Sequence, residues 1–198
     1  VDDGSGFIVL GTAAIDIAPI NDAPTGSGLP LSMAANEDTA AAVDLSALVL
    51  ADIDADTPLS LTITASSGYL AAPDGTGVSV AGSGTGVITL TGASAELHSY
   101  LADPSNILFT STAEVSGDAA AQLMLTLSDG RAATDLGTID VIVTAVNDAP
   151  TGTGIPANLG VVEETATVLA LSGLTLADPD SDSLTVTLSV SQGVLQTY

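Results

Sequence analysis

The sequence predicts an all-β protein, a tandem array of antiparallel β-sandwiches with Greek-key connections. Short runs of Val, Ile, Leu and Thr alternate in hydrophobicity, which is typical of half-buried strands. Gly, Pro, Ser and Asp separate these runs and indicate turns between them. In addition, acidic motifs recur in register along the chain, which indicates a repeated unit.

The repeat is visible in two motifs. The sequence Asn-Asp-Ala-Pro begins at Asn21 and again at Asn147, and a group of alternating aspartates begins at Asp52 and again at Asp178. Both steps equal 126 residues (147 − 21 and 178 − 52), a reasonable size for one domain. We therefore expect 1–20 to be the last strands of a preceding repeat, 21–146 a complete repeat, and 147–198 the first half of the following one.

Individual elements follow from the same patterns. Within the complete repeat, strands are expected at 59–64, 77–81, 86–91, 106–111 and 120–128. Terminal strands at 12–20 and 138–146 run into the two linkers, where proline favours extended backbone.

One segment departs from the strand pattern. Residues 94–101 carry apolar side chains at spacings of three and four, and Pro104 follows, which predicts a short helix crossing between the two sheets. In the second half-repeat, the alternating pattern of 59–64 recurs at 184–190, displaced by one residue from the 126-residue step. That half-repeat is expected to be poorly ordered if nothing completes it.

Composition excludes several classes of protein. The net charge is −23, with 24 acidic residues against a single arginine and no lysine, so nucleic acid and anionic membranes are poor partners. The 46% hydrophobic content does not fit a disordered chain. Without cysteine there are no disulfides or thiolate metal sites, and no apolar run is long enough for a transmembrane helix. Asp2 and Asp3 occupy positions where a signal peptide needs basic residues, so we expect the chain to begin within a domain.

The clustered carboxylates favour calcium. Calcium is a hard cation that takes six to eight oxygen ligands from carboxylates, amides, backbone carbonyls and water. Without a cation, alternating aspartates on a tight loop repel one another and loosen the chain. An EF-hand starting at Asp52 is excluded, because the glycine position holds Thr57 and the glutamate position holds Ile63. The ligands must therefore come from segments far apart in sequence.

These motifs together resemble a known family. A terminal strand ending in Asn-Asp-Ala-Pro, an early Glu-Asp-Thr at 37–39, the Asp-X-Asp-X-Asp loop and a late Ser-Asp-Gly at 128–130 are similar to bacterial cadherin-like repeats. Such repeats occur in large secreted adhesins of the RTX type, often exported by type I systems. The resemblance covers nearly the whole chain. It implies a cadherin- or immunoglobulin-like sandwich, an extracellular position at the bacterial surface, and calcium between successive domains.

The resemblance also implies two sets of calcium ligands, one at each linker. The first set is Asn21, Asp22, Asp52, Asp54, Asp56 and Asp129. The second set is Asn147, Asp148, Asp178, Asp180 and Asp182, with Glu37 reaching across from the preceding domain. We find no counterpart of the acidic Asp-Arg-Glu motif that helps to fill animal cadherin sites, which implies fewer or weaker ions.

Catalysis is not expected, and no catalytic or cofactor-binding residue is assigned. With one histidine, no cysteine and no lysine, the usual pairs of nucleophile and base are nearly absent. His98 and Tyr100 lie on the predicted helix and are interpreted as surface or packing residues. A pair of carboxylates that cleaves glycosidic bonds stays an open alternative. The glycine-rich stretch at 82–86 lies between predicted strands, so it is interpreted as a turn and not as a phosphate-binding loop.

The sequence thus predicts a non-catalytic, calcium-stiffened spacer or stalk of a bacterial adhesin whose partners are the neighbouring repeats. A structural subunit of an extracellular filament or sheath, formed by self-association into fibres, is an open alternative. A calcium-dependent ligand-binding module and an accessory domain of a secreted enzyme are two further alternatives. The ligand-binding module has little support, because the chain contains three Tyr, two Phe and no Trp.

Overall fold

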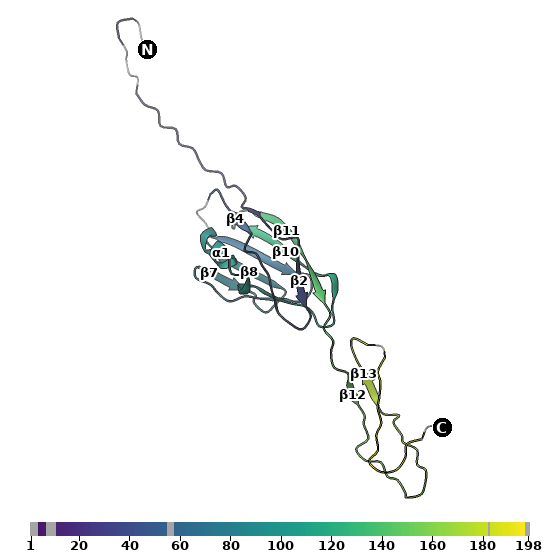
Figure 1. The fold of residues 1–198 in the computed structure, drawn as a ribbon. Coiled ribbons are helices and arrows are strands. Elements are labelled where there is room, and N and C mark those ends of the chain that lie inside the picture. Colours follow the sequence, from purple (N-terminus) through teal and green to yellow (C-terminus); the bar gives the residue numbers. More distant parts are fainter. Residues whose placement is uncertain (1–3, 7–10, 55–57, 182, 197–198) are drawn as a thin grey trace.

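A computed structural model describes residues 4–6, 11–54, 58–181 and 183–196. Nearly all regular structure in this part of the chain is β-strand, with one short α-helix and one 3-10 turn (Figure 1). The strands are β1 (Thr25–Ser27), β2 (Ser32–Asn36), β3 (Ala41–Ala42), β4 (Val49–Ala51), β5 (Leu59–Ala65), β6 (Tyr69–Ala71), β7 (Val78–Ala81), β8 (Val87–Gly92), β9 (Leu108–Thr110), β10 (Gly117–Ser128), β11 (Ala133–Thr144), β12 (Thr151–Thr153) and β13 (Thr175–Ala177). The helices are α1 (Ser94–Leu101) and η1 (Pro104–Asn106).

Two sheets make up the body of the domain. One has the strand order β2-β11-β10-β5-β8-β7, and the other has the order β3-β9-β6. The short ribbons β1-β4 and β12-β13 each form a separate two-stranded sheet. The all-β, sandwich-like class predicted from the sequence is therefore confirmed.

One strand pair departs from the antiparallel prediction. The edge strand β2 runs parallel to β11, with Ser32 opposite Asp140 and Ala35 opposite Val143. Alternation of apolar residues defines which face of a strand is buried, but it is the same for parallel and antiparallel neighbours. The sequence pattern therefore could not reveal this parallel pair.

The core follows from strict alternation in β5. Leu59, Leu61 and Ile63 are almost fully buried, whereas Ser60 and Thr62 face outward. On the outer face, the Thr62 hydroxyl lies 3.1 Å from the hydroxyl of Thr89 on the neighbouring strand β8. All buried apolar residues among those described belong to one cluster, to which every sheet-forming strand from β2 to β11 lends its inward face.

Helix α1 connects β8 of the larger sheet to β9 of the smaller one, as predicted. Its buried residues are Leu97, Tyr100 and Leu101, at the spacings of three and four that the sequence shows. The Tyr100 hydroxyl donates a hydrogen bond of 2.7 Å to the carbonyl of Pro73. This bond fixes the loop between β6 and β7 to the helix.

The two half-repeats at the ends of the chain form less structure than the sequence predicts. Residues 11–20 contain no strand, and Ile15 and Ile17 are more than four-fifths exposed. One period later, Val141 and Val143 are buried in β11, where β2 and β10 pair with it on both sides. A strand at 12–20 has no such neighbours among the described residues. The strand prediction for this segment is therefore wrong for the chain as it stands.

The same reason explains the second half-repeat. The strand predicted at 184–190 is not formed, and Val186 and Leu188 are about half exposed, at 49% and 50%. Their counterparts Leu61 and Ile63 are buried, because β5 lies between β8 and β10. Only the ribbon β12-β13 forms in this region, and it reproduces β1-β4: Thr25 pairs with Ala51, and Thr151 pairs with Ala177.

A tight turn at Gly68 provides a test of this packing. Gly68 has φ +81°, and an added Cβ would lie 2.4 Å from the carbonyl oxygen of Thr110 and 2.9 Å from the ring of Phe109. Gly84 has a similar φ of +85° with nothing within 4 Å of the added Cβ. We expect Gly84→Ala to lower the free energy of unfolding by about 1 kcal/mol through backbone strain alone. Gly68→Ala should cost about 2–4 kcal/mol, because the clash adds to the strain. Equal costs in urea unfolding would contradict the turn geometry.

Candidate metal centre

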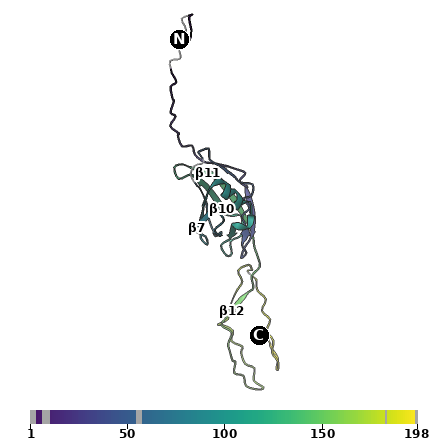
Figure 2. The ribbon, with the colours of Figure 1, turned by 90° about the vertical axis from the view of Figure 1, so that its left-hand side faces the viewer.

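The acidic residues singled out in the sequence gather at the two ends of the complete repeat. The linker at 21–24 enters at one end and the linker at 147–150 leaves from the other (Figures 1 and 2). We call the first group the N-terminal joint and the second the C-terminal joint. The N-terminal joint contains Asn21, Asp22, Asp52, Asp54 and Asp129. The C-terminal joint contains Glu37, Glu114, Asn147, Asp148, Asp178 and Asp180.

In the N-terminal joint, the aspartate loop after β4 holds the linker. The backbone N–H of Asp22 donates to Asp54 Oδ2 at 2.6 Å. The Asp54 N–H in turn donates to Asp52 Oδ1 at 2.8 Å, so the loop closes on itself. The sequence pattern Asp-X-Asp thus places two carboxylates beside a linker that precedes them by about one quarter of a repeat.

Asp129 completes this joint from the turn between β10 and β11. Its Oδ1 accepts hydrogen bonds from the backbone N–H groups of Ala132 (2.6 Å) and Arg131 (2.7 Å), and its Oδ2 accepts one from the Asn21 amide (2.8 Å). The hydrogen bond from the Ala132 N–H lowers the pKa of Asp129 most, and those from Arg131 and Asn21 lower it further. Together they hold this pKa below its usual range. Although Asp129 is only 5% exposed, it therefore stays charged.

The C-terminal joint brings together side chains from two repeats. Glu37 follows β2 and is 2% exposed, and its Oε1 accepts a hydrogen bond of 2.7 Å from the backbone N–H of Val146, just before the linker. From the following half-repeat, Asp180 Oδ2 accepts one of 2.5 Å from the backbone N–H of Asp148. The carboxylates of Glu37, Glu114 and Asp180 each place an oxygen within 4.8 Å of the other two. This group could hold a metal ion.

Neighbouring negative charges affect Glu114 in this group. Partial desolvation, together with the negative charges of Asp148, Glu37 and Asp180, raises the pKa of Glu114. The sole arginine, Arg131, lies at the opposite end of the domain, in the turn that holds Asp129, and the chain has no lysine. No basic side chain is therefore available to neutralise the group.

The two joints share one local geometry, displaced by the repeat. The bond from Asp22 N–H to Asp54 recurs as the bond from Asp148 N–H to Asp180. The bond from Asp54 N–H to Asp52 recurs as one of 3.0 Å from Asp180 N–H to Asp178. The linker asparagines repeat as well: the side-chain amides of Asn21 and Asn147 each donate to the carbonyl of the next residue.

Most of the predicted ligands are thus placed in the two joints. Asp56 and Asp182, the last aspartate of each loop, lie outside the described residues. Glu114 is the one member of the C-terminal joint that the sequence analysis missed. It lies in the loop between β9 and β10 with φ 59°, and no second copy exists within the chain, because a step of 126 in either direction leaves it. A periodicity argument could not find it.

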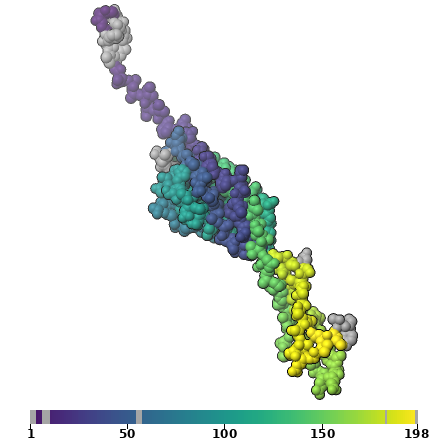
Figure 3. All heavy atoms as spheres, in the orientation of Figure 1, coloured from purple at the N-terminus to yellow at the C-terminus, as the bar shows by residue number. Residues whose placement is uncertain are grey.

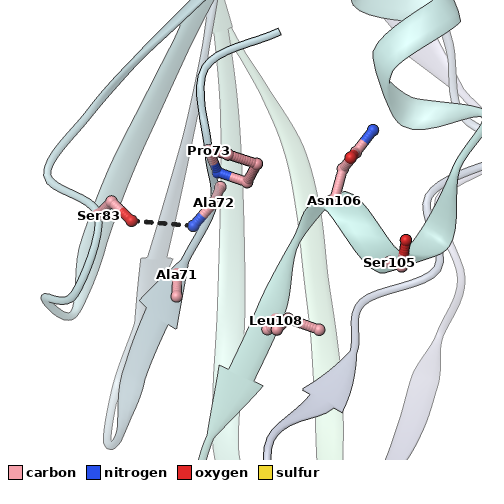
Figure 4. Close-up of a pocket in the computed structure, with 7 residues that line it drawn as sticks. All are labelled: Ala71, Ala72, Pro73, Ser83, Ser105, Asn106 and Leu108. Atoms are coloured by element: carbon pink, nitrogen blue, oxygen red, sulfur yellow. Dashed lines mark hydrogen bonds between the residues drawn. The ribbon is translucent and has the colours of Figure 1, made fainter.

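Two of the pockets on the described part of the chain suggest no further site. A shallow pocket between the end of β6, η1 and β9 is lined by Ala71, Ala72, Pro73, Ser83, Ser105, Asn106 and Leu108 (Figure 4). None of these side chains titrates, and the Ser83 hydroxyl already accepts a hydrogen bond of 3.0 Å from the Ala72 N–H. The larger hollow within 155–196 is lined mainly by apolar side chains of the half-repeat, which the space-filling view shows as a loosely folded region (Figure 3).

In comparisons with known proteins, no protein-family model matches the chain, and no curated protein matches it. Among the described residues, no helix has the length and apolar character needed to cross a membrane.

Glu114 allows a direct test of the C-terminal joint. In EDTA, Glu114→Gln should raise the thermal midpoint, because it removes one of the mutually repelling charges. The raised pKa of Glu114 means that its protonation favours the folded state, so the difference from wild type should shrink as the pH falls towards that pKa. With a divalent cation present, the same variant should instead gain less stability than wild type.

Asp118→Asn is the matched control, because Asp118 is exposed on β10 and does not belong to the acidic group. If both variants shift the thermal midpoint equally, in EDTA and in the presence of the divalent cation, Glu114 is an ordinary surface charge.

Proposed function

We propose that this chain is a calcium-stiffened, non-catalytic spacer of an extracellular bacterial adhesin, built from cadherin-like Greek-key repeats. The observation that carries the proposal is the group formed by Glu37, Glu114 and Asp180, because it joins carboxylates from two successive repeats. An ion bound there would connect the end of one domain to the start of the next.

The chemistry of the donors favours calcium over other metals. The candidate ligands are carboxylate and amide oxygens, and the chain has no cysteine. Magnesium demands a near-ideal octahedral site and loses its water reluctantly, whereas calcium accepts a larger and more flexible set of oxygens. Ligands from separate segments, held partly by a flexible linker, suit calcium better.

The mechanism is mechanical. Without the ion, the joint carries carboxylates that repel one another, so the linker is free to open. With the ion, the same carboxylates bind a common centre and the two domains move together. A string of such repeats becomes a rod that projects a distal binding region from the cell surface. The proline in each linker supports this role, since it limits the linker to extended conformations.

Thermal unfolding with EDTA, calcium and magnesium tests the metal. Calcium at ten times its dissociation constant should add about 1.4 kcal/mol per occupied site to the free energy of unfolding, with a smaller effect from magnesium at the same concentration. Asp54→Asn should reduce the gain at the N-terminal joint, and Asp180→Asn should reduce it at the C-terminal joint. No calcium-specific shift in wild type would reject the proposed mechanism.

Stiffening needs a separate measurement, because an ion could bind without fixing the domains. The chain lacks cysteine, so two introduced cysteines, Ser79→Cys on β7 and Thr153→Cys on β12, can carry spin labels at unique positions. Calcium should narrow the distribution of distances between the labels in pulsed EPR. Adding Glu37→Gln and Asp180→Asn to this pair should keep the distribution broad. An unchanged wild-type distribution would show that calcium does not act as a mechanical brace.

One observation favours the filament as a second candidate function. Val186 and Leu188 are about half exposed, whereas the positions they repeat in β5 are buried. Such apolar side chains can be covered by strands from another molecule. Sedimentation velocity separates the two functions, since a spacer stays monomeric over a wide range of concentrations and a filament subunit does not.

A further inference from the structure

We propose that protonation of His98 releases strand β4 from helix α1 and thereby loosens the aspartate loop of the N-terminal joint. His98 is the only histidine in the chain, and the metal-binding proposal gives it no role.

The contact is a pair of hydrogen bonds between α1 and one residue of β4. The Leu50 N–H donates to His98 Nε2 at 3.1 Å, and the Ser94 hydroxyl donates to the Leu50 carbonyl at 2.9 Å. On its other edge, β4 pairs with β1, Thr25 opposite Ala51 and Ser27 opposite Val49. The two side chains of α1 therefore occupy the place of a missing neighbouring strand.

This geometry requires a neutral imidazole. Because a backbone N–H only donates, Nε2 must supply its lone pair, and the ring proton must be on Nδ1. A second proton on Nε2 turns the acceptor into a donor that faces the Leu50 N–H. Leu50 is 1% exposed, so no bulk water replaces the lost acceptor.

The position of β4 connects this contact to the joint. Asp52 follows the strand directly, and Asp54 accepts the hydrogen bond from the linker N–H of Asp22. β4 is three residues long, so the loss of one of its hydrogen bonds affects a large share of its anchoring. Loosening β4 lets the aspartate loop and the linker move.

The charged surroundings do not oppose the change. The elements that pack against α1 are β4, β7, β8 and η1, and none of them contains a titratable residue. Helix α1 itself carries Glu96 and Tyr100. The flanking loops contribute acidic residues, Asp52 and Asp54 after β4, Asp74 near Tyr100, and Asp103 before η1. None of these groups carries a positive charge.

Amide hydrogen exchange of Leu50 in EDTA tests the contact without any metal. The protection factor of Leu50, divided by that of Leu90 in the central strand β8, should fall about tenfold between pH 7.5 and 5.5, in the range where histidine ordinarily takes up its proton. Leu90 corrects for global stability. His98→Gln, whose amide oxygen can accept but does not titrate, and His98→Phe, which cannot accept, should both lose this pH dependence.

The proposal is overturned if the wild-type ratio is the same at both pH values, or if either variant keeps the fall. A second arm, which rests on the proposed function, compares calcium affinity at pH 7.5 and 5.5 in wild type and His98→Gln. If lowering the pH weakens calcium binding more in wild type than in His98→Gln, the result supports coupling of His98 to the joint. Equal weakening overturns the coupling while leaving the exchange result intact. No calcium binding at either pH would instead reject the proposed function.

Discussion

Repulsion between carboxylates at the two ends of the domain is the constraint on which the rest of this structure depends. The chain carries 24 acidic residues against one arginine, so no internal pairing can neutralise them. Glu37 is nearly buried, and its charge shares one small volume with those of Glu114 and Asp180. A buried or crowded carboxylate either protonates or finds a cation. The raised pKa of Glu114 reflects the first response, and a bound calcium ion would be the second.

The domain itself keeps this charge away from its core. Strands β5, β7 and β8 contain no charged residue, and Ser and Thr such as Thr62 and Thr89 lie on the outer face of β5 and β8. The apolar cluster therefore contains no charged side chain, and the acidic groups lie at the linkers.

Much of this organisation could be predicted from the sequence, because it is repeated or periodic. The 126-residue step located both aspartate loops, and the spacing of Leu97, Tyr100 and Leu101 located the helix. Glu114 could not be found in this way, because no second copy of it lies within the chain. The role of His98 escaped for a different reason: it depends on which backbone group the imidazole meets, and a single histidine on a helix carries no pattern.

The half-repeats show the limit of local pattern. Residues 184–190 alternate in hydrophobicity as regularly as β5, yet they form no strand. Alternation shows which face of a strand would be buried, but a strand also needs neighbouring strands to pair with it and cover that face. The ribbon β12-β13 forms nonetheless, since both of its strands lie within the same half-repeat. That ribbon carries Asp178 and Asp180 to the linker. The geometry of the joint thus depends on the first 35 or so residues of a repeat and on the far end of the one before it. The hydrogen bonds of this joint therefore form without a strand at 184–190.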